Sequence, residues 1–97
     1  MLKLESIAAF SAIADAGSIT GAARRLALSK SVVSERLTEL ERILGTTLVR
    51  RTTRSLSLTD DGKTFYDRAK QIMRGVENAT TELRERRGTL TGPMCQP

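Results

Sequence analysis

The feature that most constrains the fold is a regular apolar stripe in the last third of the chain. Apolar side chains recur there at intervals of four, three, four, three and four residues: Phe65, Ala69, Ile72, Val76, Ala79 and Leu83. This heptad spacing predicts one long amphipathic helix from residue 59 to about residue 87. Thr59 supplies a hydroxyl cap, and the two acids that follow it suit the positive end of a helix dipole.

The length of this helix predicts a dimer. At 1.5 Å per residue it would measure about 40 Å, so it would overhang a compact domain built from residues 1–58. Phe65 and Ala69 can fold back on the first helix of the chain, whereas Val76 and Leu83 lie too far along. Leaving such side chains in water forgoes about 1.5–3 kcal/mol for each large one. We therefore expect two copies of the chain to pair through the stripe.

The preceding residues predict three helices and a hairpin. Apolar residues at three- and four-residue steps predict helices over 2–15, 19–26 and 31–44. Small residues at the helix ends fit the roles of caps: Gly17, Ser18, Ser29 and Gly45. Residues 46–58 alternate in steps of two, with strands at 48–50 and 56–58, which predicts a two-stranded hairpin.

Composition narrows the function. The net charge is +5, and residues 1–58 carry nine Lys and Arg against five Asp and Glu. A basic patch favours a polyanion, either nucleic acid or an anionic membrane surface, although a solvated basic loop is the alternative. The chain has no His and a single Cys, Cys95, so we expect no disulfide, metal site, cofactor or enzymatic activity. It also lacks an apolar span of about 20 residues and a signal-peptide core, which predicts a soluble cytoplasmic protein without a membrane partner.

Two short helices joined by a three-residue turn form a helix-turn-helix pattern. The second helix begins with small and polar residues: Ser29, Lys30, Ser31 and Ser34. A recognition helix enters the major groove by its N-terminal turn, where side chains must be small or able to bond base edges and phosphates. The pattern therefore predicts DNA binding. The alternative is a helical hairpin that only packs, with serines acting as caps, and Ser29 can serve both purposes.

A longer set of residues runs through four elements in a fixed order. It comprises Ala16-Gly17-Ser18-Ile19-Thr20-Gly21-Ala22-Ala23, Leu26, Ser29, Val33-Ser34, Leu40-Glu41, Leu44-Gly45, Leu48, Arg51, Arg54 and Leu58-Thr59-x-x-Gly62. The set strongly resembles the N-terminal domain of LysR-type transcriptional regulators, and the resemblance covers nearly the whole chain. MarR-like repressors, another winged-helix family, fit less well because they lack the Leu58-Thr59-x-x-Gly62 junction.

The resemblance implies a mainly α fold, with a winged helix-turn-helix of three helices and a two-stranded β wing (1–58), then a linker helix for dimerisation (59–87). It implies double-stranded DNA with an inverted-repeat operator as partner. Four residues of the recognition helix are implied to face the groove: Lys30, Ser31, Ser34 and Glu35. Arg54 matches a wing arginine that reaches toward the minor groove, while Ser18, Thr20 and Arg51 match positions of backbone contacts or local structural bonds.

The chain departs from the family pattern at a few positions. Lys30 and Ser31 stand where the family usually has Gln and Pro, and Glu35 stands where a basic residue is common. Lys30 favours guanine acceptors, and Glu35 can accept from cytosine N4 or repel phosphate, so these changes alter the expected base preference. Val49 replaces a common Phe and is expected to be a smaller core residue.

The resemblance also implies a larger C-terminal effector-binding domain. The sequence ends where that domain would begin, and Gly88-Thr89-Leu90 resembles the entry to its first strand. We therefore expect residues 88–97 to form a loose tail at this junction, a small-molecule effector to bind only through the absent domain, and the full-length protein to be a dimer or a tetramer. A protein–protein interaction module acting through the heptad helix is the alternative function.

Overall fold

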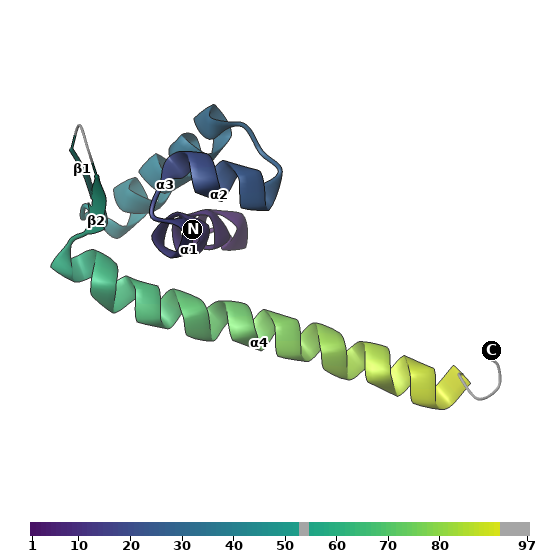
Figure 1. Ribbon diagram of the computed structural model, residues 1–97. Helices are drawn as coiled ribbons and strands as arrows, with labels where there is room; N and C mark the ends of the chain where they lie inside the picture. The colour runs from purple at the N-terminus through teal and green to yellow at the C-terminus, as the bar shows by residue number, and fades with distance from the viewer. Residues whose placement is uncertain (53–54, 92–97) are drawn as a thin grey trace.

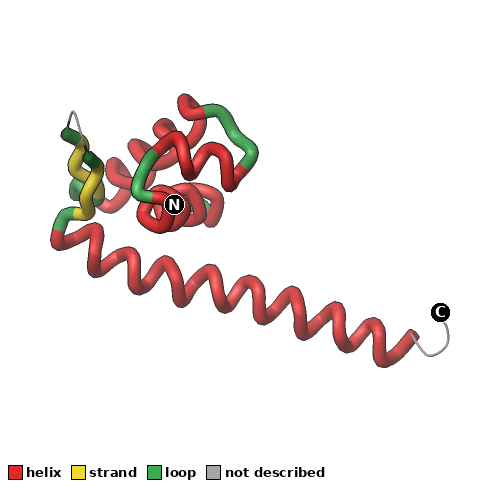
Figure 2. Tube along the Cα trace, viewed as in Figure 1, coloured by secondary structure: helices red, strands yellow, loops and turns green. Residues whose placement is uncertain are grey.

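A computed structural model describes residues 1–52 and 55–91, with side chains as far as residue 87. The elements in chain order are α1 (Leu4–Ala16), α2 (Ile19–Leu26), α3 (Lys30–Leu44), β1 (Val49–Arg51), β2 (Leu56–Leu58) and α4 (Asp60–Thr91). Figure 1 shows α1, α2 and α3 gathered into one body with the hairpin beside it. The long α4 starts below the hairpin, passes under the body and projects beyond it (Figures 1 and 2).

The helix ends follow the predicted caps. Gly17 and Gly45 both take the left-handed conformation with φ of 73°, which closes α1 and α3. The hydroxyls of Ser18 and Ser29 each accept a hydrogen bond from the backbone N–H three residues on, at 2.9 and 3.2 Å, so they start α2 and α3. Ala27 ends α2 at φ 56°, and a non-glycine residue in this region costs of order 1–3 kcal/mol. The turn between α2 and α3 is therefore held in place by the packing on either side of it.

The core is mainly aliphatic and lies between the three helices and the hairpin. Its largest fully buried side chains are Phe10, Ile13, Val33, Leu37, Leu40 and Leu48. Val49 is 6% exposed, which confirms that it serves as a smaller core residue. Ala23, also 6% exposed, lies in the same cluster on α2, where its small side chain lets the helices approach. The recognition helix α3 is thus fixed through one buried stripe, which leaves its other face for solvent.

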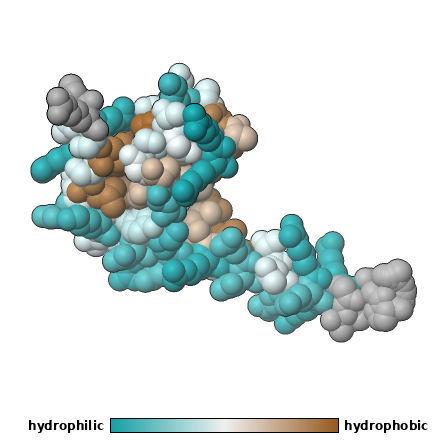
Figure 3. Space-filling view, in the orientation of Figure 1, coloured by the Kyte–Doolittle hydropathy of each residue, from teal (hydrophilic) through white to brown (hydrophobic). Residues whose placement is uncertain are grey.

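The stripe on α4 divides into two parts. The rings of Phe65 and Phe10 lie 5.7 Å apart, and Ala69 is fully buried, so the first part belongs to the core as expected. Further along, Ile72, Val76 and Leu83 are 39%, 37% and 60% exposed. In the view of Figure 3, the projecting part of α4 is mainly hydrophilic. The helix is therefore amphipathic where it leaves the body, with apolar side chains that the described residues leave largely exposed.

Several predicted boundaries were wrong, most by one or two residues. The helix α4 continues to Thr91, so residues 88–91 are helical and do not form a loose tail or the entry to a strand. The helix can continue because Gly88, Thr89 and Thr91 each cost it only about 0.5–1 kcal/mol. The next residue that would break a helix is Pro93. The strand β1 occupies 49–51, one residue later than predicted, and α1 begins at Leu4 and not at residue 2. Residues 92–97 lie outside the part of the chain that the structure describes.

The hairpin begins late because a side chain takes the place of a strand partner. The Glu41 carboxylate accepts hydrogen bonds from the backbone N–H groups of Leu48 and Val49, at 2.7 and 3.2 Å. The ladder then pairs Val49 with Leu58 in antiparallel register. Among the described residues, no helix combines the length and the apolar character needed to span a membrane.

Candidate nucleic-acid interface

The start of α3 is a solvent-facing polar surface. Ser29, Lys30, Ser31 and Glu35 are exposed, and Ser34 is partly buried. Because the Ser29 hydroxyl accepts only one N–H of the first turn, other backbone N–H groups of that turn remain without an intrahelical partner. Those N–H groups and the positive end of the helix dipole suit a phosphate near the helix start. The structure thus brings the predicted groove-facing residues together on one surface of α3.

The hairpin is tied to this surface by a side-chain bond that sequence reasoning missed. Arg51 of β1 donates from its guanidinium to the Ser34 hydroxyl of α3 at 3.3 Å. A guanidinium has five N–H donors, so this bond leaves others for a phosphate or a base edge. Ser34 and Arg51 were both predicted as site residues, but no local pattern indicates that they contact each other. Their bond couples the position of the hairpin to that of the recognition helix.

The tip of the hairpin is closed on either side of residues 53 and 54. Thr52 and Ser55 exchange several hydrogen bonds, including one from the Thr52 N–H to the Ser55 carbonyl at 2.8 Å. Arg54, predicted to reach the minor groove, lies outside the described residues. Arg50 and Arg51 are exposed on β1, so the basic character of the hairpin faces solvent.

Ser18 and Thr20 lie at the start of α2 and have different surroundings. The Ser18 hydroxyl is engaged as the cap of α2, which is a local structural bond of the kind predicted for it. Thr20 is exposed in the first turn of the same helix. Of these two residues, Thr20 presents its side chain more openly to a partner.

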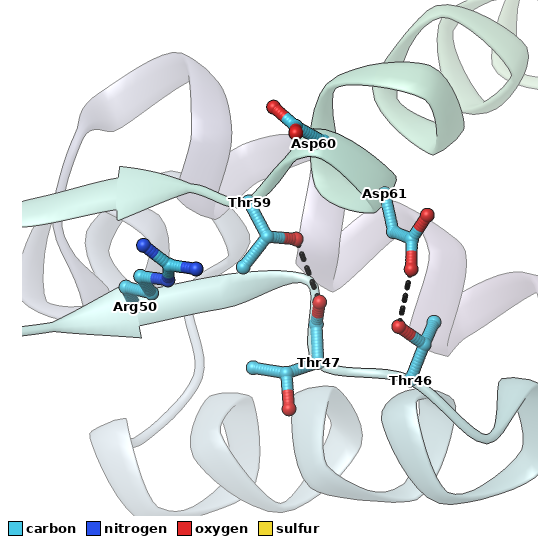
Figure 4. A pocket seen from close by; sticks show the side chains of 6 residues that line it. All are labelled: Thr46, Thr47, Arg50, Thr59, Asp60 and Asp61. Carbon is cyan, nitrogen blue, oxygen red and sulfur yellow. Dashed lines mark hydrogen bonds between the residues drawn. The ribbon is translucent and has the colours of Figure 1, made fainter.

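A polar hollow marks the junction between the hairpin and α4. Figure 4 shows its six lining residues, Thr46, Thr47, Arg50, Thr59, Asp60 and Asp61. The Thr59 hydroxyl donates to the Thr47 carbonyl at 2.6 Å and also accepts from the Gly62 N–H at 2.9 Å, while Thr46 donates to Asp61 (Figure 4). These bonds fasten the start of α4 to the loop before β1. Asp60 and Asp61 therefore fit a structural role at a helix start, and no group of three or more His, Cys, Asp or Glu placed to hold a metal occurs among the described residues.

A polar cluster joins the end of α1 to α4. Asp15 accepts hydrogen bonds from the Tyr66 hydroxyl and from Lys70 Nζ, the latter at 3.1 Å. Partial desolvation would raise the pKa of Asp15, but the bonds from Tyr66 and Lys70 outweigh it, so the pKa lies below its ordinary value. The same bonds raise the pKa of Tyr66 and of Lys70. Asp15 is thus an ionised acceptor at neutral pH, with both donors on α4.

This geometry matches a known family. Residues 4–63 match the model of the bacterial regulatory helix-turn-helix proteins of the lysR family. The chain belongs to the LysR family. It is 41% identical over 94 residues to an HTH-type transcriptional repressor of Pseudomonas aeruginosa, which covers 97% of this chain and 30% of the relative. The transcriptional regulator PtxR of the same species is 40% identical, covering 96% of this chain and 30% of that protein.

Solved LysR-family structures share the fold. The DNA-binding domain of BenM in complex with catB site 1 DNA superposes with a TM-score of 0.81 at 26% identity, covering 86% of this chain and 93% of that one. The complex of the CbnR DNA-binding domain with DNA gives 0.78 at 29%, covering 86% and 95%. Oxidised OxyR of Corynebacterium glutamicum gives 0.87 at 29%, covering 95% of this chain and 28% of that one. The chain spans about 30% of the length of the first two curated relatives.

These comparisons confirm several predictions. The chain has the DNA-binding fold of LysR-type transcriptional regulators: mainly helical, with a helix-turn-helix and a two-stranded wing. Its relatives are named transcriptional regulators, not enzymes. Which residues touch DNA, and how many copies of the chain act together, stay predictions.

Proposed function

We propose that this chain binds double-stranded DNA sequence-specifically, as a homodimer. The start of α3 enters the major groove, and the hairpin lies against the neighbouring backbone and minor groove. The observation that carries the proposal is the exposed polar start of α3, with Ser34 linked to Arg51 of the hairpin, in a chain that belongs to the LysR family. Two of the solved structures with the same fold, those of the BenM and CbnR DNA-binding domains, are complexes with DNA.

The exposed half of α4 supports the dimer. Val76 and Leu83 lie on the stripe beyond Met73, which lies by the first turns of α1, and Ile72, next to Met73, is 39% exposed. Pairing two such helices would bury these side chains and would place two recognition helices on one duplex. A two-fold dimer reads an inverted repeat, because its two half-sites are related by the same symmetry. Ala79 lies in the same stripe and leaves room for close approach of the two helices.

The expected base preference depends on Lys30 and Glu35, which are both exposed on α3. Lys30 is a point-charge donor suited to the O6 and N7 acceptors of guanine. Glu35 can accept a hydrogen bond from cytosine N4, and it repels phosphate. It therefore disfavours any docking of the protein that brings the DNA backbone near the middle of α3. We therefore infer half-sites that contain a G·C pair opposite the first two turns of α3.

The full-length relatives are about three times as long as this chain. We infer that a small-molecule effector acts through such an additional domain, and that assembly of the whole protein, as a dimer or a tetramer, depends on it. The DNA-binding part itself needs no cofactor or catalysis, and it acts in the cytoplasm. The competing function is a protein–protein interaction module in which α4 alone binds a partner.

Selection from random duplex DNA tests the proposal. The purified chain should enrich an inverted repeat, and its affinity for that repeat should fall steeply between about 50 and 200 mM salt through counterion release. Ser34→Leu should abolish the sequence preference while leaving the thermal midpoint nearly unchanged, because Ser34 is outside the core. Thr81→Leu, on the exposed part of α4 and on the face opposite the apolar stripe, is the control and should keep the preference. No enriched sequence, or an affinity that is insensitive to salt, would refute DNA binding and favour the interaction module.

A further inference from the structure

The polar cluster of Asp15, Tyr66 and Lys70, here called the Asp15 cluster, joins α1 to α4. Its members are separated by 51 and 55 residues in the sequence, yet two donors on α4 converge on one carboxylate at the end of α1. Tyr66 and Lys70 lie four residues apart, so they occupy one face of α4. Lys70 Nζ also lies 5.6 Å from the centre of the Tyr66 ring. The side chains of Asp15 and Lys70 are only 27% and 36% exposed.

The first turn of α4 is bonded to the loop before β1 through Thr46 and Asp61, whereas the other contacts described between α4 and α1 are apolar. Phe65 packs against Phe10, Ala69 is fully buried, and Met73 lies by the first turns of α1. Apolar contact is non-directional, so it holds α4 against α1 and still tolerates a change of crossing angle. Hydrogen bonds weaken steeply when their angle is wrong, and two of them on one carboxylate resist such a change. The Asp15 cluster is therefore the directional part of the contact between α4 and α1.

A small change of this angle has a large effect at the far end of α4. Leu83 lies about 20 Å beyond Lys70, at 1.5 Å per residue. Turning α4 by about 10° would move Leu83 by about 3.5 Å, close to the 3.4 Å rise of one base pair. The proposed dimer pairs through this part of α4, and α4 continues from the body without a flexible linker. The crossing angle thus sets the separation of the two recognition helices.

We propose that Asp15, through Tyr66 and Lys70, sets the angle of α4 and thereby the half-site spacing that the dimer accepts. Asp15 is a positioning residue, since it lies at the far end of α1 and acts through α4. Arg25, at the end of α2, is the other cation close enough to act on the carboxylate. The inference rests on the proposed dimeric DNA binding and adds a determinant of which operators are bound.

The test compares operators that differ only in the spacing of their half-sites. The wild-type chain should bind best at one spacing and at least tenfold more weakly when one base pair is added or removed. Asp15→Asn should reduce that discrimination to about threefold or less while binding an isolated half-site as well as wild type. Tyr66→Phe should have an intermediate effect. Asp67→Asn is the control, because it removes the same charge from an exposed residue next to Tyr66. It should behave as wild type.

A measurement without DNA separates the two proposals. Nitroxide labels at Arg24 of α2 and Arg84 of α4, in a chain with Cys95→Ser, report the angle as a distance distribution. Labelled chains are diluted in unlabelled ones so that only distances within one chain are seen. Asp15→Asn should broaden or shift the distribution, and an unchanged distribution with unchanged spacing discrimination overturns the role of Asp15. Loss of isolated half-site binding in Asp15→Asn also overturns it, because Asp15 would then support the whole fold. A wild-type chain that binds no repeat at any spacing refutes the proposed function, and the distances alone then decide on Asp15.

Discussion

Replacing Gly62 by alanine tests the packing at the start of α4. A Cβ at this buried position would lie 2.0 Å from the Leu48 carbonyl oxygen and 3.3 Å from the Leu58 Cβ. The Leu48 oxygen cannot retreat freely, because it accepts the Thr59 N–H at 3.0 Å. The backbone N–H of Leu48 donates in turn to the Glu41 carboxylate, which also holds this residue in place. Close-packed interiors offer little room, so the backbone of α4 or of the hairpin must move by about 1 Å.

The magnitude follows from three contributions. Overpacking costs about 1–3 kcal/mol, and loss of the bond to Thr59 adds about 0.5–1.5 kcal/mol. Alanine gains at most about 1 kcal/mol of helix propensity over glycine. Gly62→Ala should therefore destabilise the fold by about 1–3 kcal/mol, which corresponds to a fall of roughly 5–20 °C in the thermal midpoint of a domain of this size.

Gly75 supplies the matched control. It lies in the same helix, and a Cβ there would meet nothing within 4 Å. Gly75→Ala should keep the whole propensity gain and stabilise the fold by about 0.5–1 kcal/mol. Thermal and urea unfolding followed by circular dichroism, over a series of protein concentrations, measure both variants and separate any change in dimerisation. A Gly62→Ala variant as stable as wild type would refute the close approach of α4 to the Leu48 carbonyl.

Four other substitutions probe the remaining parts of the molecule. Val76→Asp should convert the proposed dimer to a monomer in sedimentation at micromolar concentration, because it would bury an unpaired carboxylate between the two α4 helices. A fully dimeric variant would contradict pairing through α4. Arg54→Ala should weaken specific binding by about 1–3 kcal/mol in fluorescence anisotropy at moderate salt, and unchanged affinity with an intact fold would exclude a readout role. Glu41→Ala should cost about 1–3 kcal/mol in urea unfolding, since it leaves the N–H groups of Leu48 and Val49 without their acceptor. Glu39→Ala, at an exposed ion pair, is the control and should leave the urea midpoint nearly unchanged. Asp15→Asn should lower the thermal midpoint at pH 7 and match wild type under strong acid. The folded pKa of Asp15 is lowered, so its contribution is present above the unfolded value of about 3.9 and is lost as the pH falls through the folded value; a difference that persists in strong acid would contradict this.

The elements of this fold could be predicted where the signal is local. A glycine at the end of an apolar pattern needs the left-handed conformation, and a serine before the next pattern can bond an N–H three residues on. Gly17, Ser18, Ser29 and Gly45 all behave in this way. The end of α4 was wrong because residues 88–97 were expected to form a loose tail at a domain junction, whereas the helix continues through Gly88 to Thr91.

Contacts between distant residues could not be predicted in the same way. Glu41 is one of several acids on α3, and only the path of the chain after Gly45 brings the N–H of Leu48 to it. The bond between Arg51 and Ser34 likewise depends on how the hairpin leans on α3. The predicted DNA-facing residues do share one surface, but the base that each would read depends on how the protein docks on DNA. That docking is set by the duplex as much as by this chain.

The apolar stripe of α4 shows how one periodic signal can serve two purposes. Heptad spacing alone predicts the same environment for Phe65 and Leu83, because both belong to one stripe with alternating spacings of four and three residues. What distinguishes them is the size of the body: α1 ends its contact with α4 near Met73, so the stripe changes from core to exposed surface within one turn. Since the helix runs through this boundary without interruption, a change in how its first part packs must be felt at its second part. Because α4 is one continuous helix, a change in its contacts with the core or with Asp15 would move the residues through which the proposed dimer pairs.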